Sequence, residues 1–306
     1  MTRVAVLIPC LNEAAAIGDV VAGFRRALPT AQIFVYDNGS TDRTIELARA
    51  AGAIVRSEPT RGKGSVVRRM FADVQADIYV MVDGDGTYDP DCAPAAIERL
   101  QAECLDLVTI TRDAGAAVHR PGHAFGNQAF TWLLSRLFQA QLGDVFSGYR
   151  VISRRFVKTF PAFADGFAVE TEMTVHALAM RAPTAEMPGR YGVRREGSHS
   201  KLNTVRDGLR ILMTIGRLVT EERPLPFFSI LAALLTGLAL LLGLPLVREF
   251  LETGLVPRLP TAVGVVGLIM LSGLLVASGL ILDTVRLRRY ETKRLAYLAH
   301  DGVEAP

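Results

Sequence analysis

The chain has 306 residues, of which 34 are Lys or Arg and 31 are Asp or Glu, so its formal net charge is +3. This small charge, with the basic residues scattered along the chain, excludes the clustered basic footprint of a nucleic-acid-binding protein. Three cysteines without regular spacing exclude a disulfide framework or a thiolate metal site, and they favour a reducing cytosolic setting.

Apolar runs typical of buried strands alternate with helical periodicity along the first hundred residues. The first run, residues 4–8, is too short for the core of a signal peptide and lacks a cleavage site after it, so it predicts a buried strand. The alternation predicts an α/β domain with a mostly parallel, Rossmann-like sheet and helices on both faces. In chain order the predicted elements are strand 4–8, helix 17–28, strand 33–36, a helix from about Arg43 to Gly52, strand 53–56 and strand 78–82.

Polar residues cluster where the predicted strands end, which is where open sheets of this kind bind ligands. Asp83 and Asp85 follow the last of these strands one residue apart, and Gly84 and Gly86 leave room for a diphosphate. Such a carboxylate pair favours Mg²⁺ or Mn²⁺, which complete their coordination with substrate phosphates. The alternative is an ordinary turn rich in Asp and Gly, because such a turn has the same letters.

Two further loops carry groups that suit a nucleotide. Residues 37–42 follow the second strand, and a carboxylate there suits a ribose or base edge, although the same letters also suit a turn with a helix N-cap. Residues 61–65 form a cationic loop that lacks the first Gly of a P-loop and has Gly64 after Lys63. Since no G-x-G-x-x-G follows a predicted strand either, P-loop NTPases and NAD enzymes are disfavoured.

The C-terminal part of the sequence has a different character. Residues 227–247 and 259–282 contain no charged residue, and each stretch is long enough to span a bilayer as a helix. Two buried core helices are the alternative, but globular helices of this length nearly always carry a polar stripe. Arg and Lys are more frequent in the two flanks than in the connection 248–258, so the positive-inside rule places both flanks in the cytoplasm.

The sequence therefore predicts a cytoplasmic catalytic domain in residues 1–202, an amphipathic interfacial region in 203–226, a two-helix transmembrane hairpin in 227–282, and a basic cytoplasmic tail in 283–306. In the interfacial region Arg206, Arg210 and Arg217 fall on one helical face and apolar residues on another, which suits a helix at headgroup depth. An amphipathic helix packed on the domain is the alternative. The protein is expected in the cell (inner) membrane.

Several motifs in this order give the chain a resemblance to the family 2 glycosyltransferases of GT-A fold. Among these it resembles the polyprenyl-phosphate glycosyltransferases akin to dolichol-phosphate mannose synthase and its bacterial two-span relatives. The resemblance covers nearly the whole chain. The motifs are Ile8-Pro9 with Asn12-Glu13, the loops 37–42 and 61–64, Asp83-Gly84-Asp85, Ser147-Gly148-Tyr149-Arg150, and residues 197–202 just before the membrane.

This resemblance implies an inverting transfer of a sugar from a nucleotide-sugar to an undecaprenyl or dolichyl phosphate, with Mg²⁺ or Mn²⁺ as cofactor. It implies that Asp83 and Asp85 hold the metal, and that Asp85, Arg112 and Arg120 carry catalysis. The donor is expected to meet Pro9, Asn12, Glu13, Asp37, Asn38, Ser40, Lys63, Asp83, Gly84, Arg194, Ser198 and Lys201. The acceptor phosphate is expected to meet Arg112, Arg120, Asn127 and Arg150.

Two positions depart from the pattern of the mannose synthases, because Asn38 replaces a second Asp and Thr87 stands where Gln is common. They favour a UDP-sugar, which leaves a GDP-mannose-dependent mannose synthase as the alternative. A processive polysaccharide synthase is disfavoured because the single tryptophan, Trp132, is not in a Gln-x-x-Arg-Trp motif. A non-catalytic, membrane-tethered nucleotide-binding scaffold is disfavoured because the acidic and basic site residues are intact.

No general base is assigned, because a phosphate monoester is already largely ionised at neutral pH. Glu170 and Glu172 lie two residues apart at a predicted helix start, where they are expected to assist packing or the helix N-terminus. A pair of glycosidase carboxylates is the alternative. The expected partners are the nucleotide-sugar, the polyprenyl phosphate and the lipid bilayer, with homo-oligomerisation left open.

Overall fold

The computed structural model describes residues 2–112, 135, 143–162, 169–192, 220 and 223–303. Contacts divide the chain into two compact units, Met1–Thr204 with Lys293–Pro306, and Val205–Thr292. The first unit contains the sheet and the second contains most of the two long apolar helices. The predicted interfacial region 203–226 lies almost wholly outside the described residues.

The first unit contains a seven-stranded sheet with the strand order β3-β2-β1-β4-β6-β5-β7. The strands are β1 Val4–Cys10, β2 Gln32–Asp37, β3 Ile54–Ser57, β4 Ile78–Met81, β5 Leu107–Arg112, β6 Arg150–Ser153 and β7 Thr184–Gly189. All neighbouring pairs are parallel except those of β6, which runs antiparallel to both β4 and β5. The predicted mostly parallel sheet is therefore confirmed, with one antiparallel strand inserted near its middle.

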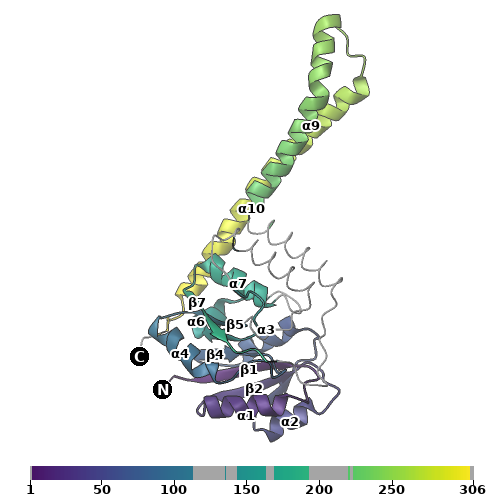
Figure 1. Cartoon of the computed structure of the whole chain (residues 1–306). Helices are drawn as coiled ribbons and strands as arrows, with labels where there is room; N and C mark the ends of the chain where they lie inside the picture. The colour runs from purple at the N-terminus through teal and green to yellow at the C-terminus, as the bar shows by residue number, and fades with distance from the viewer. Residues whose placement is uncertain are drawn as a thin grey trace. The chain divides into compact units, whose positions relative to one another are not determined.

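Helices cover both faces of this sheet, as the sequence predicted (Figure 1). They are α1 Ile17–Ala27, α2 Thr44–Ala50, α3 Lys63–Asp73, α4 Cys92–Ala102, α6 Arg154–Thr159 and α7 Val169–Met180. One apolar core packs α1, α2 and α4 against side chains such as Val6 and Ile8, and the other packs α3, α6 and α7 against Ala5 and Leu7. Successive residues of β1 thus point into opposite cores, as in a strand buried on both faces.

The register of β1 with its neighbours decides where the polar loops begin. Cys10 pairs with Asp37 at the end of β2, and Leu7 pairs with Met81 at the end of β4. Because all three strands run in the same direction, the loops that follow them leave the sheet at one edge. This edge is where the sequence placed the candidate site.

The second unit contains α9 (Pro224–Thr253) and the larger part of α10 (Leu259–Leu298). Both helices are long and apolar enough to cross a membrane, and only 17% and 11% of their most apolar stretches are buried. They touch through small and polar residues, because Thr236 Oγ1 lies 2.7 Å from Ser272 Oγ, which donates to the carbonyl of Ala232. Exposed leucines cover the remaining surface, which argues against two core helices of a soluble protein.

Both helices extend beyond the predicted spans 227–247 and 259–282. α9 continues through Arg248 to Thr253 and stops at Gly254, whose φ of 72° suits the left-handed end of a helix. α10 continues past residue 282 because its charged residues pair along the helix, as Arg288 does with Glu291 at 2.8 Å. The connection between the helices is therefore shorter than the predicted segment 248–258.

The C-terminal segment of the chain is an integral part of the first unit. Asp106, which is fully buried, accepts hydrogen bonds from Ser153 Oγ at 2.6 Å, from Arg155 and from the Tyr297 hydroxyl. The Arg155 guanidinium also lies over the Tyr297 ring, 4.2 Å from its centroid. A buried carboxylate needs such partners, so Tyr297 completes an interior cluster that the first 204 residues leave open.

We expect Tyr297→Ala to lower the free energy of unfolding by about 3 kcal/mol, because it removes a buried aromatic ring. Tyr297→Phe keeps the ring and loses only the hydroxyl, so it should cost about 1–2 kcal/mol. Thermal unfolding of the full-length protein in detergent measures both, with the exposed neighbour Leu298→Ala as the control. Equal melting temperatures for wild type and Tyr297→Ala would show that the cluster does not stabilise this unit.

Candidate active site

The loops after β1 and β2 are joined by hydrogen bonds between their polar residues. Asn12, with φ of 53°, accepts from the Thr41 N–H at 2.8 Å and donates its own backbone N–H to Ser40 Oγ at 2.8 Å. The Glu13 N–H donates to Thr44 Oγ1 at 2.9 Å. These contacts give Asn12 and Ser40 a structural task, while their predicted contact with a nucleotide-sugar remains a prediction.

Asp37, at the end of β2, is buried and holds the start of its own loop. Its carboxylate accepts from the N–H of Gly39 at 2.9 Å and from that of Ser40 at 3.1 Å. Gly39 has φ of 81°, a conformation that glycine adopts without strain. Pro9, another predicted donor contact, is buried within β1 opposite Tyr36.

Asn38 connects β2 to the loop that precedes α3. Its side-chain N–H₂ donates to the carbonyls of Glu58 at 2.9 Å and Thr60 at 2.8 Å, and its oxygen accepts from the Gly62 N–H at 2.8 Å. An aspartate could accept from Gly62 but could not donate to the two carbonyls. The replacement of Asp by Asn noted in the sequence thus has a local structural reason, which is to hold the loop that leads to Lys63.

The acidic pair after β4 consists of two differently placed carboxylates. Asp85 is buried, and its Oδ1 accepts from the Thr87 N–H at 3.1 Å and the Thr87 hydroxyl at 2.7 Å. The side chain of Asp83 remains 31% exposed. A Cβ at Gly148 would clash with Asp83 Oδ2, so this glycine makes room for the carboxylate.

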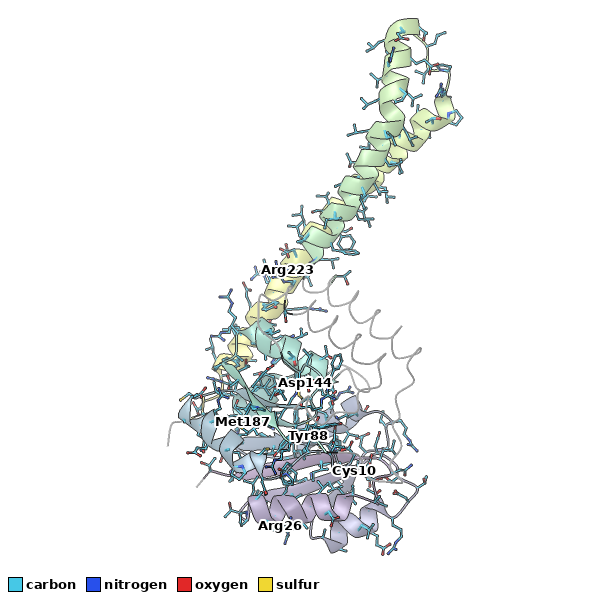
Figure 2. All side chains as sticks on the ribbon, in the orientation of Figure 1. Cys10, Arg26, Tyr88, Asp144, Met187 and Arg223 are labelled. Carbon is cyan, nitrogen blue, oxygen red and sulfur yellow. The ribbon has the colours of Figure 1, made fainter. Side chains whose placement is uncertain are left out.

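Gly84 has a packing role besides the one that the sequence suggested. A Cβ at this position would clash with Cys10 Sγ and approach Ile8, both of which belong to the interior. Cys10 is labelled in the sheet-containing unit in Figure 2. The absence of a side chain at Gly84 therefore allows the loop to pack on β1, while its predicted contact with the donor diphosphate stays a prediction.

Lys63, the first residue of α3, connects Asp83 to a third carboxylate. Its Nζ forms ion pairs with Asp83 Oδ1 and with Oε1 of Glu170, which lies in the first turn of α7. Burial alone would lower the pKa of Lys63, but the two carboxylates outweigh it and raise the pKa above its usual value. Burial raises the pKa of Glu170, and the ammonium of Lys63 opposes that rise.

Arg112, at the end of β5, forms a bidentate ion pair with Asp144. Its Nε lies 2.6 Å from Asp144 Oδ2, and its Nη2 donates to Oδ1 at 2.8 Å. Burial by itself would raise the pKa of Asp144, but the guanidinium outweighs it and holds the pKa below its usual range. Figure 2 labels Asp144 in the same unit as Tyr88. A phosphate that meets Arg112 would have to share the guanidinium with Asp144.

Arg150 does not fit its predicted contact with the acceptor phosphate. Its side chain is fully buried, where Nε donates to the carbonyl of Ser147 at 3.1 Å and Nη2 donates to Val145 and Thr174. A guanidinium sealed in this way cannot reach a ligand at the surface. We therefore assign Arg150 to the interior, as a residue that holds the Val145–Ser147 turn.

Five of the predicted site residues lie outside the described part of the chain: Arg120, Asn127, Arg194, Ser198 and Lys201. Their roles stay predictions.

The donor set after β4 fits a divalent cation. Within the described residues no group of three or more His, Cys, Asp or Glu side chains could enclose a metal. Two carboxylates on one loop, one of them partly exposed, are what a Mg²⁺ or Mn²⁺ ion uses when substrate phosphates and water complete its coordination. The site thus suits a metal that arrives with a phosphorylated ligand.

A mostly parallel sheet with an acidic pair at its carboxyl edge defines an α/β protein of the class that binds ligands at that edge. The family model for Glycosyl transferase family 2 matches residues 5–160. The chain belongs to this family, so it is a glycosyltransferase, and the predicted family is confirmed.

Relatives and solved structures agree with this assignment. The chain is 34% identical to glycosyltransferase AglJ of Haloferax volcanii over 305 residues. This alignment covers 96% of this chain and 98% of the relative. A dolichyl-phosphate hexose transferase of the same organism is 28% identical over 220 residues, or 72% of this chain and 95% of the relative. Glucosyl-3-phosphoglycerate synthase from Mycobacterium tuberculosis, solved in complex with Mn²⁺, UDP-glucose and phosphoglyceric acid, aligns with a TM-score of 0.58 at 26% identity, over 72% of this chain and 79% of that chain.

The sequence assigned Glu170 to packing or the helix N-terminus, with a catalytic carboxylate as the alternative, and it did not identify Asp144. Glu170 shares a helical face with Met173, Thr174 and Ala177, and this spacing could have indicated that its side chain points inward. Asp144 had no such signal, because its partner Arg112 is 32 residues away in the sequence.

We expect Asn38→Asp to lower the free energy of unfolding by about 2 kcal/mol, because it removes two amide donations and places a carboxylate against two carbonyls. Asn12→Asp is the matched control, since the described side-chain contacts of Asn12 use only its oxygen as an acceptor. Thermal unfolding of both variants in detergent measures the difference. Equal losses at the two positions would contradict the role assigned to the Asn38 amide.

Proposed function

We propose that this glycosyltransferase transfers a sugar from a nucleotide-sugar, with a UDP-sugar favoured, to a polyprenyl phosphate at the membrane. The observation that carries the proposal is the presence of α9 and α10, two helices long and apolar enough to cross a bilayer, in the same chain as a family 2 catalytic domain. An acceptor with a lipid tail explains why a sugar transferase carries such helices. The dolichyl-phosphate hexose transferase among the relatives supports this acceptor class.

The donor and metal parts of the proposal rest on the carboxylate pair and on the solved neighbours. Glucosyl-3-phosphoglycerate synthase was solved with Mn²⁺ and UDP-glucose, and the chain aligns with 79% of it. Asp83 and Asp85 are the residues that would hold the cation here, which when bound neutralises charge on the leaving diphosphate. Thr87, a departure from the mannose synthase pattern, favours a UDP-sugar as well.

The proposed reaction is a single displacement at the anomeric carbon. An oxygen of the acceptor phosphate forms its bond to this carbon as the bond to the nucleoside diphosphate breaks on the opposite face, so the configuration inverts. The phosphate is already ionised near neutral pH, so no side chain has to remove a proton. Arg112, whose side chain is 27% exposed, would orient the phosphate together with Arg120, because guanidinium groups bind phosphate oxygens in bidentate fashion.

We further propose that the catalytic domain (1–202) and the tail (283–306) are cytoplasmic and that the membrane is the cell (inner) membrane. The support is the excess of Arg and Lys in the segments that flank the two spans. Cysteine accessibility across intact membranes tests the orientation, because Cys104 is exposed in the catalytic domain. It should react with an impermeant reagent only after the cells are opened.

The test of the function is to offer the purified full-length protein a panel of UDP- and GDP-sugars with Mn²⁺ or Mg²⁺, and to measure the nucleoside diphosphate released. One arm contains undecaprenyl or dolichyl phosphate in detergent, and the other contains phosphoglyceric acid, which is bound in the solved neighbour. Release with the lipid phosphate and inversion at the anomeric carbon support the proposal. Release only with the soluble acid would contradict the lipid acceptor.

We expect Asp85→Asn to lower turnover with the active donor by at least about a hundredfold, because a ligand charge of the metal is lost. The change retains an oxygen that can accept from Thr87, so the melting temperature should stay close to that of wild type. Asp89→Asn is the control, since Asp89 lies on the same loop and accepts from the Asp91 N–H. Wild-type turnover by Asp85→Asn that still requires the metal would refute the metal assignment.

A further inference from the structure

Glu170 is a buried acidic residue for which the proposed mechanism has no use. Its side chain is only 4% exposed, and Oε2 has no hydrogen-bond partner among the described residues. An ionised carboxylate in the interior is costly unless it is paired. The single ion pair that the described residues give Glu170 is the one with Lys63.

Lys63 lies between an inner and an outer carboxylate. Glu170, on the inner side, is sealed from solvent, whereas Asp83, on the outer side, is 31% exposed and belongs to the proposed metal pair. The ammonium of Lys63 and a divalent cation would therefore compete for the same Asp83 carboxylate. Lys63 can move between partners, because its charge sits at the end of a flexible four-carbon stem.

We propose that Glu170 is a positioning residue that controls how readily a divalent cation binds at Asp83. It does so by accepting the ammonium of Lys63 when the cation takes its place on Asp83. The unpartnered Oε2 gives Glu170 the capacity for a second hydrogen bond from this ammonium. The inference rests on the proposed metal role of Asp83 and Asp85, and it adds an internal competitor for that site.

The position of the three residues in the fold supports this division of roles. Lys63 begins α3 directly after Gly62, whose φ is 123°, so the backbone at this helix start is held in a conformation that favours glycine. Glu170 lies in the first turn of α7, and Asp83 follows β4. Since α3 and α7 belong to the same apolar core, Glu170 is held in a fixed position relative to Lys63. Asp83, in contrast, lies on a loop.

The experiment is a double-mutant cycle that uses the affinity for Mn²⁺ alone, measured by electron paramagnetic resonance on full-length protein in detergent. We expect Lys63→Met to bind Mn²⁺ about tenfold more tightly and Glu170→Gln about tenfold more weakly than wild type. In the Lys63→Met background, Glu170→Gln should change the affinity less than about twofold. If Glu170 had only a structural role, the effect of Glu170→Gln on the Mn²⁺ affinity would not depend on Lys63.

Glu172→Gln is the matched control, because it removes the same charge from the same helix. Glu172 lies two residues from Glu170, so its side chain faces another side of the helix. It should leave the Mn²⁺ affinity unchanged. If Lys63→Met does not fold, the double variant removes both charges together and should bind Mn²⁺ about a hundredfold more tightly than Glu170→Gln.

Equal weakening by Glu170→Gln with and without Lys63 would overturn the inference, because Glu170 would then act on the cation by its own charge. Unchanged affinity in all variants would overturn it as well. If wild type itself binds no Mn²⁺, the proposed metal site fails together with the inference. Binding by wild type that Asp85→Asn abolishes, without coupling between Lys63 and Glu170, refutes the inference alone.

Discussion

The parallel pairing of β1 with both β2 and β4 is the constraint on which the candidate site depends. Because the three strands run in one direction, the residues that follow them reach the same edge of the sheet. This pairing brings together polar residues that are more than 70 positions apart in the sequence, from Asn12 to Asp83. Parallel neighbours also require crossover connections, and α1 and α3 supply them while they cover opposite faces.

The sequence predicted those parts of the fold that short-range patterns determine. The apolar runs at residues 4–8 and 78–82 are buried on both faces, so they could be identified as strands without knowledge of their neighbours. The antiparallel strand β6 could not, because its place between β4 and β5 follows from pairing across about 70 residues, such as Met81 with Arg150. The resemblance implied that Arg150 meets the acceptor phosphate, whereas its side chain is fully buried in the structure.

The same distinction applies to the charged residues of the first unit. Acidic and basic residues are visible in the sequence, but their partners come from remote elements, as with Asp106 and Arg155, or Asp144 and Arg112. Since a buried charge is costly without a partner, the fold selects pairs that no local spacing reveals. Lys63 differs from these because it lies between two carboxylates, one sealed and one partly exposed. The ammonium of Lys63 can therefore move from one carboxylate to the other, whereas the charged group of a simple buried pair has only one partner.

The two long helices are the feature on which the proposed lipid acceptor rests. A helix in a bilayer satisfies its own backbone hydrogen bonds, so with the proposed membrane location α9 and α10 would need only weak contacts such as Thr236 with Ser272 to associate. A lipid phosphate is confined to the surface of the same membrane. A catalytic domain tethered there meets it at a raised effective concentration, without any additional contact to the lipid. In the proposed function the sheet edge supplies the sugar chemistry, and the helices favour a lipid over a soluble acceptor.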